Sequence, residues 1–441
     1  MLIQFSVGNY RSFKERTVFS MVAANTKSKD PLINKNNVFH EENNLELLTS
    51  TAIYGANSSG KSNLVKALAF MRQFVLTSAS TPIDSLIPVE PFQLSTETEN
   101  EPSFFEIIFC IEHGIQYRYG FEVNNKKVIS EWLFAIPKTK EARYFTREES
   151  AIDPSSKYFK EGKGLIEKTR PNALFLAVAA QFNGETSLSI VNWFQQIAIV
   201  SGLDDTFYRG YTINQVSTGQ YRNAIIKLVK DLDLDIENIE VNKLEKDRFR
   251  LPPGITEVIQ PLLIKNIEDN GLFTINTIHQ KLDQKGKSVG SIKFDMGNNE
   301  SEGTQKAFFL AGPIISVLSL GNVLIIDEME ARLHPILTRN LIQLFNSIET
   351  NPKHAQLIFT THDTNLLSNK IFRRDQIWFI EKDKFCASHL YSLAEIKIDD
   401  NKVRNDASFE DDYLKGRYGA IPFLGGIKKV VLEEGQNIVE K

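Results

Sequence analysis

An eight-residue segment, GANSSGKS at residues 55–62, constrains the fold of this 441-residue chain more than any other feature. It fits the pattern G-x-x-x-x-G-K-[ST] at every fixed position. The apolar run before it, residues 51–54, predicts a strand, and the helical spacing of apolar residues over 62–75 predicts a helix. A chance glycine-rich turn has no need for a lysine followed by a hydroxyl. We therefore interpret the segment as a phosphate-binding loop between a strand and a helix.

The residue types in this loop suit a nucleoside triphosphate bound with Mg²⁺. Glycines let the backbone N–H groups and the helix N-terminus face the phosphates. Lys61 would neutralise the β/γ charge, and the Ser62 hydroxyl would bind Mg²⁺. The loop residues predicted to contact the nucleotide are Asn57, Ser58, Ser59, Gly60, Lys61, Ser62 and Asn63.

Two adjacent acids follow a second apolar run, VLII at residues 323–326. A buried strand delivers such acids to the carboxyl edge of a parallel sheet. Asp327 would complete the Mg²⁺ shell, and Glu328 would polarise the attacking water. The alternative is that these acids only cap the following helix.

Two further segments are candidates for phosphate contacts. His362 follows the apolar strand predicted at residues 356–361 and would hydrogen-bond a γ-phosphate oxygen, although a lone histidine usually has a plainer role. Ser301 and Gly303 precede a long apolar helix, where free N–H groups form an anion site. The alternative there is a simple serine cap with Glu302 in the first helical turn.

The pattern of predicted elements indicates an α/β fold with a phosphate loop on a mainly parallel sheet. After Gly303 a helix alternates with strands at 323–327, 356–361 and 376–381, including a helix between the last two. Residues 2–22 predict a hairpin and 103–134 an antiparallel meander. We divide the chain into a first part of the core (1–98), an antiparallel β subdomain (99–160), an inserted helical and mixed subdomain (161–296) and a second part of the core (297–441).

Composition limits the partners of the chain. A formal charge of −4 leaves no global basic excess for nucleic acid. Local candidates, KLEKDRFR at 243–250 and the pair Arg373 and Arg374, are mixed with acids or too short, so a solvated surface is favoured and nucleic acid is not indicated by charge. We find neither a signal peptide nor an apolar run of about 18 residues, and expect a cytoplasmic protein without a membrane span.

The order of these motifs resembles that of ABC-type ATPase heads of the RecF, Rad50 and SMC kind. The resemblance implies Mg²⁺-dependent ATP hydrolysis by two copies that enclose two ATP molecules. Lys61 and Ser62 resemble Walker A residues, Asp327 and Glu328 resemble Walker B, and His362 resembles the switch histidine. By the same likeness, Ser301 and Gly303 would be the signature that touches the other copy's ATP, and Gln93 in PFQLS would be the Q-loop glutamine and a further metal ligand.

The form DE-x-E-x-x-LHP at 327–335, the start NYRSF at 9–13 and the end at 413–422 resemble the AAA15/AAA21 group of bacterial ATPases. Within that group the chain is similar to RloA- and AbiLi-type proteins of phage-defence and abortive-infection operons. This implies a homodimer or higher even-numbered oligomer that controls a separate effector, a nuclease or toxin. His334 has the alternative role of a cap before Pro335.

Two other functions remain open from the sequence: a RecF-like DNA-repair ATPase, and a scaffold that binds nucleotide without hydrolysis. Glu328 argues against the scaffold, because a pure binder has no need for a positioned base.

Overall fold

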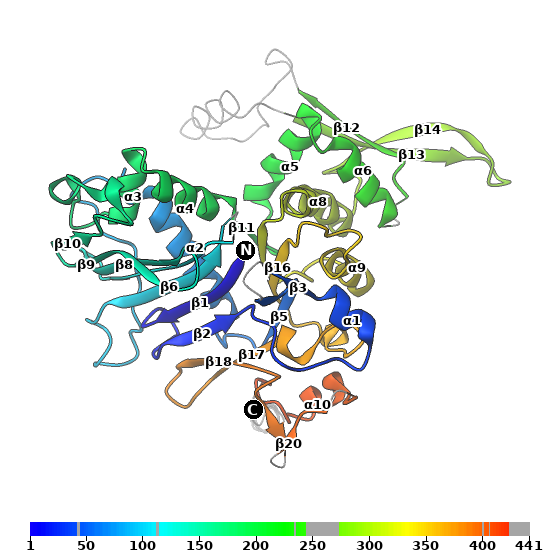
Figure 1. The fold of residues 1–441 in the computed structure, drawn as a ribbon. Helices are drawn as coiled ribbons and strands as arrows, with labels where there is room; N and C mark the ends of the chain where they lie inside the picture. Colours follow the sequence, from blue (N-terminus) through cyan, green and yellow to red (C-terminus); the bar gives the residue numbers. More distant parts are fainter. Residues whose placement is uncertain are drawn as a thin grey trace, which may run out of the picture.

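A computed structural model describes residues 1–41, 45–111, 114–232, 235–243, 273–398, 401–404 and 406–422. Its centre is a six-stranded sheet with the order β11-β15-β16-β5-β17-β18 (Figure 1). The strands are β5 (Ser50–Tyr54), β11 (Ala198–Ser201), β15 (Val323–Asp327), β16 (Gln356–Thr360), β17 (Ile377–Lys382) and β18 (Ser388–Ser392). Every neighbouring pair is parallel except β17 and β18. The predicted mainly parallel sheet is confirmed.

A second, antiparallel sheet has seven strands in the order β10-β9-β8-β7-β6-β1-β2. They are β1 (Leu2–Gly8), β2 (Thr17–Ser20), β6 (Ser103–Cys110), β7 (Gln116–Val123), β8 (Val128–Ile136), β9 (Ala142–Glu148) and β10 (Ala151–Pro154). The predicted hairpin and the predicted meander belong to one sheet, because β1 pairs with β6 with Phe5 opposite Ile107. The antiparallel sheet therefore contains strands from both the first part of the core (1–98) and the predicted antiparallel β subdomain (99–160).

The first hydrophobic core lies between the two sheets. Helix α2 (Lys61–Thr77) fills it with Leu64, Leu68 and Met71, and α3 (Phe175–Gln181) and α4 (Glu185–Gln196) add to the same core. Strand β15 alternates between the two cores, with Ile325 in the first and Ile326 in the second. Both faces of the central sheet are thus buried, as expected for parallel strands.

The second core covers the opposite face of the central sheet. It is built by α5 (Thr206–Thr218), α6 (Arg222–Asp231), α8 (Glu302–Leu320), α9 (Pro335–Phe345) and α10 (Phe409–Leu414). By length and composition alone, helix α8 could span a membrane. Because 72% of its apolar window is buried inside the protein, α8 has the setting of a core helix.

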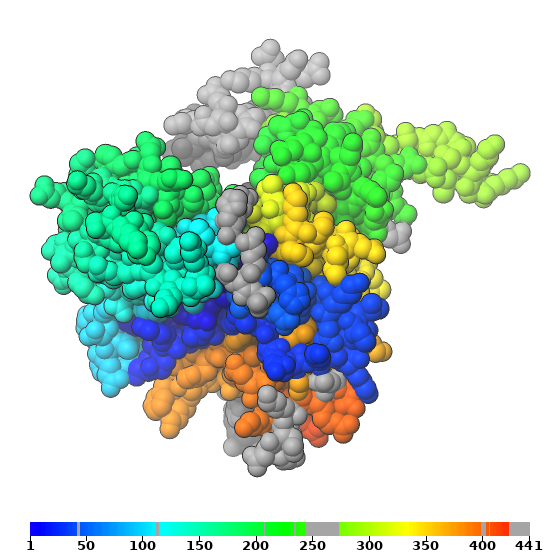
Figure 2. Space-filling model, viewed as in Figure 1, coloured from blue at the N-terminus to red at the C-terminus, as the bar shows by residue number. Residues whose placement is uncertain are grey.

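The segment predicted as an insertion, 161–296, contributes to both cores. Helices α3 and α4 pack in the first core, α5 and α6 pack against α8, and β11 is an edge strand of the central sheet. Strands β12 (Asn238–Lys243), β13 (Phe273–Leu282) and β14 (Ser288–Asp295) form a separate sheet whose β13–β14 hairpin stands away from the body (Figures 1 and 2). Of the basic candidate at 243–250, residues 244–250 lie outside the described residues.

The predicted helix between β16 and β17 is wrong. The chain forms two short 3-10 turns there, Thr364–Leu366 and Arg374–Gln376. The Asp363 carboxylate accepts a hydrogen bond from the Asn365 N–H and closes the first turn locally, in the way that such side chains compete with helical hydrogen bonding.

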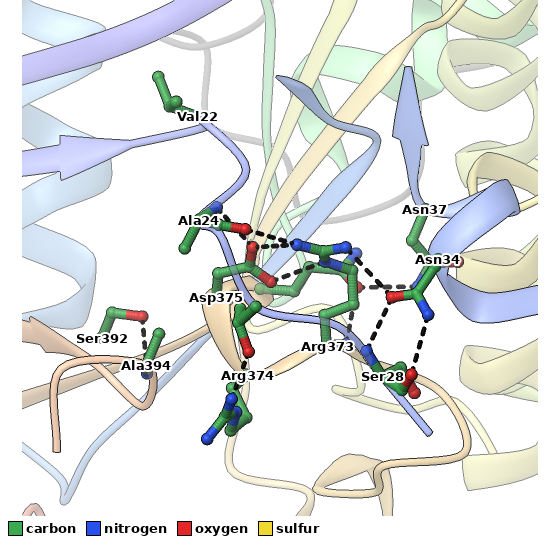
Figure 3. A network of polar contacts seen from close by, with 12 residues as sticks. Val22, Ala24, Ser28, Asn34, Asn37, Arg373, Arg374, Asp375, Ser392 and Ala394 are labelled. Atoms are coloured by element: carbon green, nitrogen blue, oxygen red, sulfur yellow. Dashed lines mark hydrogen bonds and ion pairs between the residues drawn. The ribbon is translucent and has the colours of Figure 1, made fainter. Parts of the chain in front are cut away.

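A polar network joins the second of these turns to the N-terminal region (Figure 3). Arg373 is only 5% exposed, pairs with Asp375 at 2.7 Å and donates to the Ala24 carbonyl and to Asn34 Oδ1. Asp375 in turn accepts the Ala24 N–H at 2.7 Å. The prediction of a solvated surface at Arg373 is therefore wrong, because its buried guanidinium connects one segment to another by hydrogen bonds.

The remaining elements are α1 (Pro31–Asn36), β3 (Val38–His40), β4 (Glu46–Leu48), β19 (Lys397–Ile398) and β20 (Asn401–Lys402).

Candidate nucleotide-binding site

The glycine loop turns tightly between β5 and α2. A Cβ atom on Gly55 would lie 2.3 Å from the Ile380 carbonyl oxygen, and one on Gly60 would lie 2.3 Å from Ser388 Oγ. Gly60 also has a φ of 119°, which L side chains rarely adopt. Only glycine allows the loop to lie this close to β17 and β18.

Two serines from distant segments hold the loop in place. Ser388 Oγ donates to the Ser59 carbonyl at 2.5 Å, and Asn63 Nδ2 donates to Ser12 Oγ at 2.8 Å. The Ser388 N–H donates to the Ser12 carbonyl at 2.7 Å, which connects the two serines. Sequence reasoning missed both roles. The NYRSF resemblance pointed to Ser12, whereas Ser388 has no local signal.

The loop opens onto a cavity of about 480 Å³. Its lining comprises Asn57, Ser58, Ser59, Gly60, Lys61, Ser62, Asn63, Glu328 and His362. The seven loop residues predicted to contact nucleotide thus share one cavity with the predicted base and the predicted switch histidine.

The cavity suits a phosphate group. Lys61 Nζ donates to the carbonyls of Gly55 at 2.7 Å and Ala56 at 3.1 Å. Burial lowers the pKa of Lys61 to about 8, against the opposing effect of Glu328 and Asp327. The buried Ser59 hydroxyl finds no partner among the described residues. A phosphate would give the Ser59 hydroxyl an acceptor and would accept the third N–H of the Lys61 ammonium.

Thr360 organises the two acids at the end of β15. Its hydroxyl donates to Asp327 Oδ1 at 2.6 Å and accepts the Glu328 N–H at 2.7 Å. Strands β15, β16 and β5 are parallel neighbours, so their carboxyl ends meet at the edge that carries the loop. Within the described part of the chain, no three His, Cys, Asp or Glu residues are grouped to hold a metal. A Mg²⁺ ion here would rely on Ser62, Asp327 and phosphate oxygens.

Gly202 fixes the backbone of Glu328 from the side of β11. Its N–H donates to the Asp327 carbonyl at 2.6 Å, and a Cβ at this position would lie 1.8 Å from the Glu328 carbonyl oxygen. Glu328 itself has a φ of 55°, an unusual value for a residue with a side chain. Gly202 lies in the segment predicted as an insertion, 161–296, and no sequence pattern marks it as a site residue.

Three more hydrogen bonds hold the loop after Glu328. Glu330 Oε1 accepts the His362 N–H at 2.5 Å, so the loop is tied to the end of β16. Lys306 Nζ, on α8, donates to the Met329 carbonyl at 3.1 Å and to the Ala331 carbonyl. Burial lowers the pKa of Lys306 to about 8. Burial, followed by the charge of Lys61, also lowers the pKa of His362 and favours its neutral imidazole.

Four predicted site residues are not among those that line this cavity. Asp327 directly precedes the lining residue Glu328, and the other three belong to different segments. Ser301 caps α8, with Oγ accepting the Thr304 N–H at 3.1 Å, and Glu302 follows in the first turn as in the plainer alternative. A Cβ on Gly303 would lie 2.9 Å from the Arg332 carbonyl oxygen. Gln93 is exposed in the segment between α2 and β6. The signature and Q-loop roles stay predictions.

His334 has the predicted role of a helix cap. Its Nδ1 accepts the Ile336 N–H at 3.3 Å, and Pro335 follows as the first residue of α9. Because the imidazole caps a helix that begins with proline, the LHP motif has a structural explanation in this chain.

A strand, phosphate loop and helix on a parallel sheet, with an acid pair at the end of a nearby strand, define a P-loop nucleotide-binding protein. The chain belongs to the family described as "AAA domain, putative AbiEii toxin, Type IV TA system", whose model matches residues 50–368. This is an ATPase-type family, and the match includes the loop, the acid pair and His362.

The chain is similar to several solved structures over most of their length, at low sequence identity. An SMC head bound to the C-winged helix domain of ScpA is 13% identical, with 89% of this chain and 97% of that chain covered and a TM-score of 0.44. The SMC head domain from Thermotoga maritima is 11% identical, with 90% and 99% covered and a TM-score of 0.38. The recombination mediator RecF is 13% identical, with 88% and 98% covered and a TM-score of 0.34. Comparison with curated proteins finds no match.

Proposed function

We propose that the chain is an ABC-type ATPase that hydrolyses Mg²⁺-bound ATP. The observation that carries this proposal is the single cavity lined by the phosphate loop, Glu328 and His362. It places a cationic phosphate contact, a carboxylate and a neutral imidazole around one space. A site for binding alone would need only the first of these.

Each group has a role that its surroundings support. The Lys61 ammonium counters the β/γ-phosphate charge, and the Ser62 hydroxyl with Asp327 holds Mg²⁺. Glu328, fixed by Gly202 and by Thr360, orients the attacking water and takes its proton. His362, whose pKa is lowered by burial and then by the charge of Lys61, donates to a γ-phosphate oxygen.

The second half of the site would come from another copy of the chain. Ser301 and Gly303 stand at the start of α8, where Ser301 is exposed and the helix N-terminus can receive an anion. They are separate from the cavity of their own chain, which supports a head-to-tail pair with two ATP molecules and a homodimer or higher even-numbered oligomer. Gln93 would reach the metal in that assembly.

The biological role we propose is control of an effector in antiviral defence in the cytoplasm. It is supported by the family's description as an AbiEii-type AAA domain and by the resemblance to phage-defence ATPases. ATP binding would assemble the pair, and the pair would hold or license a nuclease or toxin encoded beside it.

Mass photometry of Glu328→Gln, with and without Mg-ATP and after co-expression with the neighbouring gene, tests these steps. The substitution keeps the phosphate contacts and removes the base, so we expect an ATP-dependent even-numbered oligomer that retains the neighbour's product. A monomer that is indifferent to ATP would contradict the shared site. Lys61→Ala, which loses the phosphate counter-charge, is the control that should stay unassembled.

A further inference from the structure

The outer part of the β13–β14 hairpin is an isolated arm. Residues 280–293, which we name the arm, are all exposed, and Figures 1 and 2 show them extending away from the body beyond α6. At its base, His279 Nε2 lies 2.6 Å from Glu300 Oε1, and β12 pairs with the inner half of β13. The hairpin is therefore anchored at one end and free at the other.

A two-stranded ribbon in water is only marginally stable by itself. We therefore expect the arm to bind a partner. Its tip is nevertheless well formed. The Asp283 N–H donates to the Lys287 carbonyl at 2.9 Å, and Asp283 Oδ1 accepts the N–H groups of Lys285 and Lys287. Gly286 supplies the positive φ of 75° that the turn requires.

Positive charge is concentrated at this tip. Residues 281–287 contain three lysines and one aspartate, a net charge of +2 in a chain whose formal charge is −4. Lys293 is the only lysine of the arm that forms an ion pair with a described residue, Glu240 at 2.6 Å. Lys281, Lys285 and Lys287 are thus available to an anionic partner.

The dimensions of the arm match the major groove of B-form DNA. The two paired strands of such a ribbon lie about 4.8 Å apart. Four residues of one strand rise roughly 14 Å, which is longer than the groove is deep. The major groove is about 12 Å wide and about 8.5 Å deep and admits a two-stranded ribbon. The major groove of A-form RNA is too narrow for side chains to read. The shape therefore favours duplex DNA over duplex RNA.

We propose that the arm binds duplex DNA, with its strands in the major groove and Lys281, Lys285 and Lys287 on the flanking phosphates. Three apolar side chains of the arm are exposed, Leu282 at 53%, Val289 at 57% and Ile292 at 42%. Thymine methyl groups in the groove offer them apolar contact. This function is independent of ATP hydrolysis and assigns a nucleic-acid surface to a chain without a global basic excess.

Fluorescence anisotropy with labelled DNA and RNA duplexes of one sequence, over a salt series, tests the proposal. The full-length protein should bind the DNA more tightly than the RNA. Replacing Lys281, Lys285 and Lys287 together by Gln should weaken DNA binding at least tenfold. The slope of log affinity against log salt should become shallower by about 0.9 for each phosphate that a lysine no longer neutralises.

The matched control replaces three exposed lysines in turns of the antiparallel sheet, Lys126, Lys138 and Lys140, by Gln. Both variants lose the same charge, and the control should bind DNA as the native chain does. Equal weakening in the two variants would overturn the proposal, since charge alone would then explain binding. Equal affinity for RNA would overturn it as well, because the fit to the major groove would then not decide binding. No DNA binding by the native chain would also overturn it and would leave a protein partner for the arm. Melting temperatures of both variants establish that they are folded.

Discussion

Gly202→Ala should slow ATP hydrolysis without removing ATP binding. The added Cβ would lie 1.8 Å from the Glu328 carbonyl oxygen, and Cβ atoms essentially never approach closer than 3.0 Å. The two backbones must therefore separate by about 1.2 Å, a value obtained from these two distances. Because the clash is with backbone, a side-chain rotation of Glu328 cannot relieve it.

A displacement of this size acts on the residue that orients water. Misplacement by about 1 Å costs roughly 100-fold in rate, and overpacking costs about 1–3 kcal/mol in the free energy of unfolding. We expect kcat to fall by about 100-fold, while the affinity for ATP stays within a few-fold, since the phosphate loop follows another strand. Steady-state turnover, nucleotide titration and chemical denaturation measure the three quantities.

Gly210→Ala is the matched control. Gly210 lies in α5 and has no atom within 4 Å of an added Cβ among the described neighbours. Alanine in a helix interior is favoured over glycine by about 0.5–1 kcal/mol, so this variant should be as active as the native chain and slightly more stable. A Gly202→Ala protein that turns over ATP at the native rate would refute the argument that β11 positions Glu328.

Three other predictions concern the same site. Glu328→Gln should bind ATP with near-native affinity in a nucleotide titration and lose at least 100-fold in turnover, because only the base is removed. If its turnover equalled that of the native chain, the hypothesis of a scaffold that binds nucleotide without hydrolysis would be favoured instead. Thr360→Val leaves the Glu328 N–H without its acceptor and should cost about 1–3 kcal/mol in denaturant unfolding, whereas Thr360→Ser keeps the hydroxyl and should cost less. The pKa of Lys61 is about 8 in the free protein, and bound phosphate stabilises its charged form, so ATP binding takes up a proton above that pH. Below pH 8 Lys61 stays charged, so its contribution to ATP affinity should not change with pH. Above pH 8 the ATP affinity should fall by about tenfold per pH unit. Lys61→Arg, which stays charged, should show no such fall.

Local patterns explain why the phosphate loop and the acid pair were predictable. A strand, a glycine loop and a helix follow one another within residues 50–77, and their spacing is written in consecutive residues. The same holds for β15 with Asp327 and Glu328. The alternation of strands and helices after Gly303 also predicted the parallel sheet, with the exception of the helix expected between β16 and β17.

The sequence by itself thus determined which groups carry the chemistry, because a phosphate loop and a strand-ending acid depend on neighbours along the chain. Only the tertiary structure decided what holds them. Ser388, Gly202 and Thr360 act on Ser59, Asp327 and Glu328 across the sheet, and the strand order that joins them comes from pairing between distant segments. It also decided that Arg373 is buried and that the lysines of the arm stand free, since burial depends on the packing of elements that no local pattern records.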